Sequence, residues 1–218
     1  MRTLPTFFGI TLIAGLAGGC VQQPTAHGAW AEGVSHDKTY SRVLVVGVSH
    51  NIKTRCAFER YLAAQIQGEQ TEAFTSCDSI DKDQREPLTR ASIEQAVAAR
   101  KADAVVATVL VASDMQAVQG GGRDTRGTAG YKATDAGWWD GYYGTYGVPV
   151  VYGEFKSTAE ITTIQADVTV ATKVFETAGA SPVYSVETTA KRLESRAEGL
   201  SAVTTPIAER LRKDGLIR

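Results

Sequence analysis

Few side chains in this sequence have the type and spacing needed for acid–base or nucleophilic chemistry. Of the histidines, His27 and His36 lie in a stretch without periodicity, and His50 is the only one in the part expected to fold. His50 follows the apolar run 42–48, and ligands often bind just past the carboxyl end of a parallel strand. The sequence has no Gly-x-Ser-x-Gly elbow and no Cys–His motif with supporting context. A hydrolase centred on His50 therefore ranks last among the functions considered, and we expect no catalytic residue.

Two other short motifs lack a residue that their chemistry requires. The glycine run 120–122 is followed by neither Gly-Lys-Ser/Thr nor a helical pattern, so it does not predict a phosphate-binding loop. The acidic stretch 78–86 resembles a calcium loop, but Glu86 stands where the sixth position counted from Asp81 needs glycine. We therefore expect no metal site and no cofactor.

Cys56 and Cys77 are the cysteines of the part expected to fold. Cys56 lies in the first turns of an expected helix, and Cys77 follows the strand after that helix. Because the chain reverses between helix and strand, the start of one lies near the end of the other, and an oxidising compartment permits a disulfide. Two alternatives stay open: a Cys56–Cys77 bridge, or two separate thiols with Cys56 packed as a small apolar side chain.

The stretch 115–147 is rich in glycine and aromatic residues and shows no period. A connection longer than about 12–15 residues without secondary structure is unusual, which indicates a functional or disordered segment. Exposed aromatic rings stack on sugars, contact lipid or anchor a partner protein. The alternative is that the rings fold onto the domain's own surface. The candidate partner-contact residues are Trp138, Trp139, Tyr142, Tyr143 and Tyr146.

The elements that must position these residues begin with a continuous apolar run at 42–48, which predicts a buried strand. Apolar residues then recur at every fourth position, which predicts a helix over 52–67 with Asn51 as its N-cap. Two strand–helix–strand units in succession predict parallel strands joined by right-handed crossovers. The later elements of these units are a strand near 70–75, a helix starting at Thr89 and the apolar strand 104–111.

The second half of the sequence predicts antiparallel structure. Residues 155–175 and 183–189 have the composition of strands, with turn residues between them, so we expect a hairpin. A helical stripe beginning at Leu200 follows. Pro206 is expected to kink or restart this helix, and Gly215 is expected to cap its end.

Together these elements predict one α/β domain over residues 41–218, α+β in its second half. We expect a three-layer-like mixed sheet of about five strands, in the order β-α-β-α-β followed by a β-hairpin and a C-terminal helix. The sequence shows no internal repeat and no second shift in composition, so a single domain accounts for this part of the chain.

Residues 1–19 have the order of a secretory signal peptide: the positive charge of Arg2, an apolar run from Leu4 to Leu16, and then small residues. A transmembrane anchor is the alternative, but a spanning helix needs about 20 apolar residues. This run is shorter and contains Pro5. We therefore expect an export signal that is removed from the mature protein.

The sequence Leu16-Ala17-Gly18-Gly19-Cys20 resembles the lipobox of bacterial lipoproteins, in which the cysteine is acylated and the signal is cut before it. The usual pattern has its large apolar residue three places before the cysteine, whereas here Ala17 holds that place. The resemblance implies palmitate on Cys20, and each buried methylene adds about 0.8 kcal/mol of membrane affinity. Val21 rather than aspartate follows, which favours the periplasmic face of the outer membrane over retention in the inner membrane.

Residues 20–40 mix Gly, Pro, Gln, His and Ser without a convincing period. We therefore expect a flexible tether between the lipidated Cys20 and the domain. A flexible chain of about twenty residues has a mean span of roughly 25 Å, which would let the domain stand off the lipid surface. His27 and His36 lie in this stretch without partner ligands, which favours a solvated spacer over a metal site.

A series of motifs carries a further resemblance: Arg-Val-Leu-Val-Val-Gly-Val-Ser at 42–49, Arg-Cys-Ala-Phe-Glu at 55–59, Ala-Asp-Ala-Val at 102–105, a Gly/Tyr-rich insertion, a hairpin and Lys-Asp-Gly-Leu-Ile at 213–217. This order resembles a family of uncharacterised proteobacterial outer-membrane lipoproteins. The α/β domain of that family is similar in outline to the periplasmic domains of the curli-secretion lipoprotein and of the lipoprotein activators of penicillin-binding proteins. The resemblance implies a fold and a compartment, and no catalytic residues.

The composition excludes some function classes. The 218 residues are 43% hydrophobic and 22% charged, with 23 basic and 24 acidic side chains and a formal net charge of -1. A nucleic-acid-binding protein usually has a basic excess, so none is expected. We expect a non-enzymatic lipoprotein whose periplasmic domain binds an envelope protein or glycan, or assists assembly, through 115–147. The alternative is a small-molecule or glycan-binding lipoprotein with a pocket near Ser49, His50 and that loop. The oligomeric state is not indicated.

Overall fold

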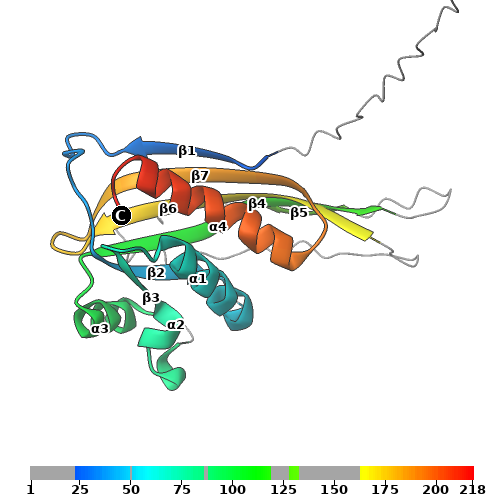
Figure 1. Ribbon diagram of the computed structural model, residues 1–218. Coiled ribbons are helices and arrows are strands. Elements are labelled where there is room, and N and C mark those ends of the chain that lie inside the picture. The colour runs from blue at the N-terminus through cyan, green and yellow to red at the C-terminus, as the bar shows by residue number, and fades with distance from the viewer. Residues whose placement is uncertain (1–22, 50, 86–87, 119–127, 133–162) are drawn as a thin grey trace, which may run out of the picture.

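The computed structural model describes residues 23–49, 51–85, 88–118, 128–132 and 163–218. These residues form a seven-stranded mixed sheet and four α-helices (Figure 1), so the α/β fold class predicted from the sequence is confirmed. The strands are β1 Thr25–Trp30, β2 Arg42–Val48, β3 Glu72–Thr75, β4 Ala104–Val118, β5 Thr128–Lys132, β6 Thr163–Glu176 and β7 Ser181–Leu193. The helices are α1 Ile52–Ile66, α2 Ser76–Ser79, α3 Arg90–Arg100 and α4 Arg196–Lys213, with a 3-10 turn at Lys82–Gln84.

The sheet combines parallel and antiparallel pairs. The strand order is β1-β7-β6-β4-β2-β3, and β5 pairs with the outer part of β4. β2 is parallel to both of its neighbours, whereas the pairs β4–β6, β6–β7 and β7–β1 are antiparallel. β1 and β5 were not predicted, which is why this part of the chain has seven strands rather than about five.

β2 is buried on both faces, as its continuous apolar sequence predicts. Val43 and Val45 pack in one cluster with α1 and α4, while Leu44 and Val46 pack in another with α3. Successive residues of a strand point to opposite faces, so this one apolar run supplies both clusters. Around β2 the molecule therefore has three layers, helix, sheet and helix (Figure 1).

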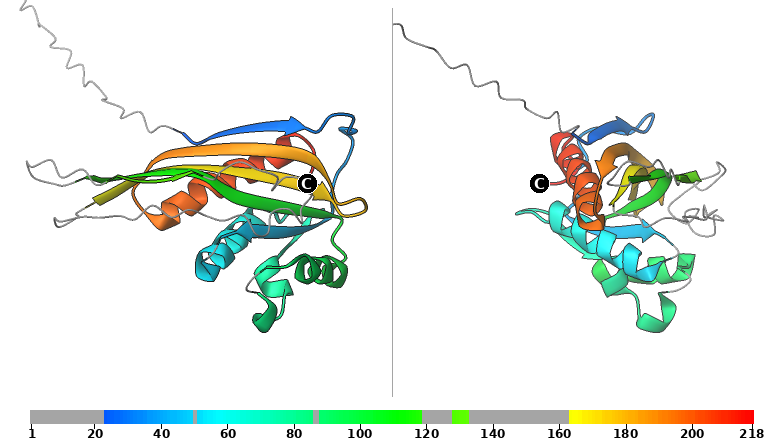
Figure 2. Two further views of the ribbon diagram at one scale, coloured as in Figure 1. Left: turned by 180° about the vertical axis from the view of Figure 1, so that it is seen from behind. Right: turned by 90° about the vertical axis from the view of Figure 1, so that its right-hand side faces the viewer.

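The β6–β7 hairpin was predicted, and in the described residues α4 covers one of its faces. Tyr184 and Val186 are buried in the cluster that contains α4, whereas Ser185 is half-buried and Glu187 is exposed. α1 and α4 lie side by side over this face of the sheet (Figure 2). The alternation of buried and exposed residues along β7 is typical of a strand with one covered face.

The helix boundaries follow from recognisable capping residues. Asn51 caps α1 as predicted, because its side chain accepts from the backbone N–H of Thr54 at 3.0 Å. Thr89 caps α3 in a reciprocal capping box. α4 continues through Pro206 as a single helix, so the restart given as one alternative does not occur. Gly215 follows α4 with φ +82°, a left-handed conformation that favours glycine.

The prediction of a flexible tether over 20–40 is wrong at residues 25–30. β1 forms there and pairs antiparallel with β7 along its whole length. Every second residue of β1 is half-buried, and two of the three inward positions are Ala26 and Gly28. Side chains this small produce no clear apolar alternation, so the sequence pattern did not indicate a strand.

The prediction of an aperiodic stretch over 115–147 is wrong at 115–118 and 128–132. β4 continues to Val118 between β5 on one side and β6 on the other. The register of β4 against β6 shifts between Leu110 and Ala112. A bulge of this kind interrupts the period of two, so the strand was expected to end near that point.

Candidate functional site

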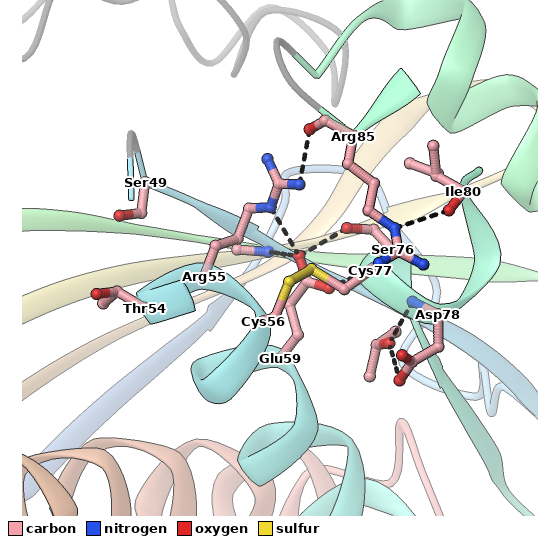
Figure 3. Close-up of polar contacts among 12 residues, drawn as sticks. Ser49, Thr54, Arg55, Cys56, Glu59, Ser76, Cys77, Asp78, Ile80 and Arg85 are labelled. Carbon is pink, nitrogen blue, oxygen red and sulfur yellow. Dashed lines mark hydrogen bonds and ion pairs between the residues drawn. A yellow bond between two sulfur atoms is a disulfide. The ribbon is translucent and has the colours of Figure 1, made fainter. Parts of the chain in front are cut away.

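The carboxyl end of β2 lies between β3 and β4, the two strands parallel to it. β2 leads through α1 to β3, while β4 continues past the end of β2 and pairs there with β5 on the same edge. In open α/β sheets, ligands bind outside the carboxyl ends of the strands. The side chains drawn there in Figure 3 come from the end of β2, the first turns of α1, and α2 with the segment that follows it.

Gly47 allows the first turns of α1 to approach β2 closely. A Cβ at this position would lie 3.2 Å from Cγ of Arg55 and 3.4 Å from a ring carbon of Phe58. Glycine inside a strand commonly marks such a close approach of another element. The backbone N–H of Gly47 is consequently within reach of a carboxylate on α1.

That carboxylate belongs to Glu59, which is completely buried. Its Oε1 accepts from the backbone N–H of Gly47 at 3.0 Å and from the hydroxyl of Ser76 at 2.6 Å. Its Oε2 accepts from the backbone N–H of Cys77 at 2.8 Å. One side chain of α1 thereby joins β2 and α2 (Figure 3). Partners of this kind offset the cost of burying a charged group.

Arg55 supplies the counter-charge to Glu59 from one turn earlier in α1. Its Nε lies 3.8 Å from Oε1 of Glu59, its Nη2 donates to the carbonyl of Arg85 at 2.7 Å, and only 3% of the residue is exposed. Burial raises the pKa of the Glu59 carboxyl, while its three hydrogen bonds and the charge of Arg55 oppose that rise. The two residues form a buried ion pair whose carboxylate is fully engaged by donors.

Cys56 and Cys77 are joined in a disulfide, which is the first of the two alternatives that the sequence left open. The Cα atoms are 5.6 Å apart, and the cysteines are separated by 21 residues in sequence. Cys77 is completely buried, and Cys56 is 9% exposed. Each cysteine adjoins the buried pair, because Cys56 follows Arg55 and the N–H of Cys77 binds Glu59. The bridge therefore holds α1 and α2 at the spacing that the carboxylate requires.

The polar and sulfur groups of this cluster stabilise the end of β2. Both sulfur atoms are oxidised, and both oxygens of Glu59 accept hydrogen bonds. The hydroxyl of Ser76 donates to Glu59, and Oγ of Ser49 accepts from the backbone N–H of Asn51 at 3.2 Å. The arrangement fixes the start of α1 and the end of β2 relative to each other.

Most of the predicted functional residues lie outside the described ranges: Cys20, His50, Trp138, Trp139, Tyr142, Tyr143 and Tyr146. Ser49, which was predicted to line a ligand pocket with His50, is described and is half-buried just after β2. The predicted pocket and contact surface therefore stay proposals.

The two described histidines and the acidic stretch occupy separate places. His27 is exposed on β1, whereas the ring of His36 stacks on Trp30 with centroids 4.7 Å apart. Asp78 pairs with Arg60 at 2.7 Å on the surface. Among the described residues, no group of three His, Cys, Asp or Glu side chains could hold a metal ion. None of the helices that these residues form is long and apolar enough to cross a membrane.

A second polar cluster, which the sequence analysis missed, lies between β1, β7 and α4; we call it the Tyr184 cluster. The buried hydroxyl of Tyr184 donates to the carboxylate of Asp214 and accepts from Nε of Arg210 at 3.1 Å. Burial and the hydrogen bond to Asp214 raise the pKa of Tyr184 to about 12. Gly28 lies over this hydroxyl, since a Cβ there would overlap it. The ring of Trp30 packs edge-on at 5.2 Å from that of Tyr184.

One signal in the sequence could have indicated the buried ion pair. Arg55 and Glu59 stand four residues apart on the helix face that also carries Cys56 and Leu62. Opposite charges at this spacing are neighbours on a helix, and charges on an apolar face are buried only when paired. The Tyr184 cluster gives a weaker signal, because Tyr184 is 26 residues from Arg210.

Comparison with known proteins gives structural similarity only. No protein-family model matches the chain, and no curated protein matches it. A dodecamer of a single-substitution variant of PelC from Paraburkholderia phytofirmans is 14% identical, with a TM-score of 0.43 over 89% of this chain and 99% of that chain. A PelC dodecamer from the same organism is 11% identical, with a TM-score of 0.44 over 90% of this chain and 100% of that chain. At these values the similarity assigns no function to the present chain.

Proposed function

We propose that the chain is a lipoprotein held through acylated Cys20 at the periplasmic face of the outer membrane. Its non-enzymatic α/β domain binds an envelope partner or assists assembly there. The structural observation that carries the proposal is the Cys56–Cys77 disulfide. The lipobox-like sequence Leu16–Cys20 and the signal-like residues 1–19 supply the rest of the support.

The disulfide supports the proposal through the compartment in which it is stable. Disulfides form and persist in oxidising compartments, including the bacterial periplasm, and are rare in the reducing cytosol. This bridge is enclosed by the fold, with Cys77 completely buried beside Glu59. A bridge in that position stabilises the folded domain, so a chain exported before folding benefits from it.

Metabolic labelling with palmitate tests the anchor. Wild-type protein expressed in a Gram-negative bacterium is expected to take up label and to lose residues 1–19, whereas Cys20→Ala should do neither. The matched control is the double variant Cys56→Ala/Cys77→Ala, which removes the other cysteines and should stay labelled. Unlabelled wild-type protein that retains its first nineteen residues contradicts the proposal.

Membrane fractionation tests the expected location. On a density gradient the wild-type protein should sediment with outer-membrane markers. Val21→Asp should move it to the inner-membrane fraction, because aspartate after the acylated cysteine favours retention there. Gln23→Asp adds the same charge further along the chain and should leave the protein in the outer membrane. Wild-type protein in the inner-membrane fraction argues against the proposed location.

Photocrosslinking in cells tests the proposed contact through 115–147. A photoreactive amino acid at Trp138, Trp139 or Tyr142 should give discrete adducts with envelope components. The matched control is Tyr61, a 42% exposed aromatic residue on α1, which should give none. Co-purification of partners should be lost when Trp138, Trp139, Tyr142 and Tyr143 are replaced by serine. Unchanged pull-downs count against this contact.

A second candidate function is binding of a small molecule or glycan at the carboxyl end of β2. The position favours it, because ligands of open α/β sheets bind outside the carboxyl ends of parallel strands. Calorimetric titration with muropeptides and neutral oligosaccharides should then show saturable heat. Ser49→Arg should remove that heat, while Ser181→Arg, at the distant β6–β7 turn, should not. If the wild-type protein gives no saturable heat with these ligands, they are not bound at this position.

A further inference from the structure

The two edges of the sheet are protected to different degrees. β3 forms one edge and has only four residues. The backbone N–H of Ala73 donates to the side chain of Gln67 at 3.0 Å. The carbonyl of Thr75 accepts from the hydroxyl of Ser79 at 2.6 Å. A short edge strand whose backbone groups already have partners resists the addition of another strand.

β1 forms the opposite edge, at the top of the sheet in Figure 1, and contains no Lys, Arg, Asp or Glu. The N–H of Ala31 just beyond it donates to the carbonyl of Val183 in β7 at 3.0 Å. Alternate residues of an antiparallel strand direct their backbone groups to opposite sides, so those of Ala26, Gly28 and Trp30 point away from β7. In the described part of the chain these groups have no hydrogen-bond partner. The outer side of β1 can therefore accept a further strand.

The side chain of Arg210 lies beside the middle of this edge, on the face that α4 covers. A Cβ on Gly28 would lie 2.7 Å from Nε of Arg210. That Nε donates to Tyr184 and to Asp214, so these two bonds leave the terminal nitrogens Nη1 and Nη2 unused. The Arg210 side chain is 28% exposed. A guanidinium is therefore within reach of a side chain on a strand added next to Gly28.

The charge beside the edge favours an acidic segment over a second copy of the chain. Two β1 strands paired about Gly28 would bring the Arg210 side chains of both copies together. Exposed Lys213 follows three residues later and lies on the same side of α4, and the charge of Asp214 balances only one of these two cations. Like charges across a strand pair are destabilising, whereas a carboxylate forms a charge-assisted hydrogen bond with a guanidinium.

We propose that the outer edge of β1 binds an extended acidic segment of a partner protein by strand addition. The segment pairs antiparallel, which continues the pattern of β6, β7 and β1 and is the more stable arrangement. Its acidic residue lies opposite Gly28 on the α4 face and pairs with Arg210. Residues directly opposite each other have Cβ atoms about 5 Å apart, which such a pair can span. The contact is separate from 115–147 and does not depend on acylation of Cys20.

Binding of synthetic peptides tests the acidic preference. The probe is fluorescein-labelled Val-Thr-Val-Thr-Glu-Thr-Val-Thr-Val, and the protein is the full chain purified in detergent. Matched peptides carry glutamine or lysine in place of the central glutamate. Fluorescence anisotropy should show about fivefold tighter binding of the glutamate peptide than of the glutamine peptide, and the weakest binding for lysine. No saturable binding of the glutamate peptide, or equal affinity for the glutamate and lysine peptides, overturns the inference.

N-methylated peptides test whether the backbone of the segment makes the contact. When the central side chain lies beside Gly28, the N–H of the central residue faces β1 and the N–H of the next residue faces away. Methylation of the central nitrogen should therefore abolish binding. Methylation of the nitrogen that follows is the matched control and should preserve it. Binding that survives methylation of the central nitrogen overturns the inference.

Hydrogen exchange resolved to single amides locates the peptide on β1. In the free protein, Ala26, Gly28 and Trp30 should exchange faster than His27 and Ala29, whose N–H groups face β7. The glutamate peptide should slow exchange at the three outward amides by about tenfold or more and leave β3 unchanged. Slow exchange at these amides in the dilute free protein shows that the chain already covers the edge and overturns the inference. Slowing that increases with protein concentration in the absence of peptide indicates a second copy and also overturns it.

Arg210→Gln tests the assigned ion pair. The variant should bind the glutamine peptide as the wild-type protein does, which shows that the edge is intact, and should lose most of the preference for glutamate. The matched control is Arg60→Gln, which removes a surface arginine of α1 and should keep the preference. Full preference for glutamate in Arg210→Gln overturns the inference. The methylated peptides are measured on the wild-type protein, so their result does not depend on how the variant folds.

Discussion

β2 and β7 belong to the same sheet but are buried in different ways. β2 has helices over both faces, and residues 43–47 are all buried. Along β7, half-buried Ser185 and exposed Glu187 alternate with buried Tyr184 and Val186. We call β2 and β3 with helices α1, α2 and α3 the parallel half; it contains the disulfide and the buried ion pair. We call β1, β6, β7 and α4 the antiparallel half; it contains the Tyr184 cluster.

The two halves differ in how many elements depend on a single side chain. In the parallel half, one carboxylate, that of Glu59, joins β2, α1 and α2 beside a covalent bridge. In the antiparallel half, long ladders distribute the stabilisation over many residue pairs. Loss of one side chain should consequently destabilise the parallel half globally and the antiparallel half locally.

The largest expected effect follows from Glu59→Ala. The change leaves Arg55 buried without its counter-charge and removes the acceptor of three hydrogen bonds, so the free energy of unfolding should fall by about 3–5 kcal/mol. Denaturant unfolding followed by circular dichroism measures it. The matched control is Glu94→Ala, which breaks the exposed pair with Arg90 and should cost less than about 1 kcal/mol. Similar losses of stability for Glu59→Ala and Glu94→Ala would contradict the role assigned to the buried carboxylate.

The next largest effect is expected from removal of the disulfide. Cys56→Ala/Cys77→Ala should lower the free energy of unfolding by about 3 kcal/mol, because the bridge closes a loop of 21 residues in the unfolded chain. Thermal unfolding with and without a reductant measures it. Reduced wild-type protein should resemble the double variant, and the variant should not respond to the reductant. If the reductant also lowers the stability of the double variant, the effect of the reductant does not arise from the Cys56–Cys77 disulfide.

A smaller and more local effect is expected from Trp30→Ala in the antiparallel half. The half-buried ring contacts Tyr184 and stacks on His36, so its loss should cost about 1–2 kcal/mol. Amide hydrogen exchange should accelerate in β1 and stay unchanged in β2, which would sharpen the comparison. Equal acceleration in β2 would show that the two halves unfold as one unit.

The smallest effect is expected from Asp78→Asn on the surface of the parallel half. The hydrogen bond from Arg60 lowers the pKa of Asp78, so the folded state binds this proton more weakly than the unfolded state. The stabilisation is therefore present above the ordinary pKa and is lost as pH falls through the lowered value. Because both side chains are about half exposed, Asp78→Asn should cost less than about 1 kcal/mol at neutral pH. The wild-type and variant proteins should become equally stable in acid, and a difference that persists there contradicts the assignment.

The parts of the fold that were predicted are those whose burial produces a strong pattern. Burial on both faces gave β2 a continuous apolar run, and Asn51 and Thr89 marked the starts of α1 and α3. β1 could not be predicted from its own residues, because its inward positions include alanine and glycine and its partner strand lies far away in sequence. The far part of β4 was hidden by the bulge after Leu110.

The candidate site was predictable where it depended on chain order. The reversal between α1 and β3 brings Cys56 near Cys77, so the predicted topology offered the bridge as one of two alternatives, and the structure has it. The burial of Glu59 depends on Gly47 admitting α1 closely, which is a packing detail that periodicity does not encode. The Tyr184 cluster depends on β1 reaching β7, and no local pattern brings those residues together.

The pairing of β1 with β7 also has a consequence for the order of events in time. The hydroxyl of Ser185 meets the carbonyl of Ala29 across 156 residues of sequence. A contact between residues so far apart in sequence forms late, because a long loop must close first. On the proposed export route β1 would emerge early and β7 near the end, so this edge of the sheet would stay unpaired until most of the domain had crossed. On the proposed anchor, folding would therefore finish at the bilayer, with the first strand exported among the last to be paired.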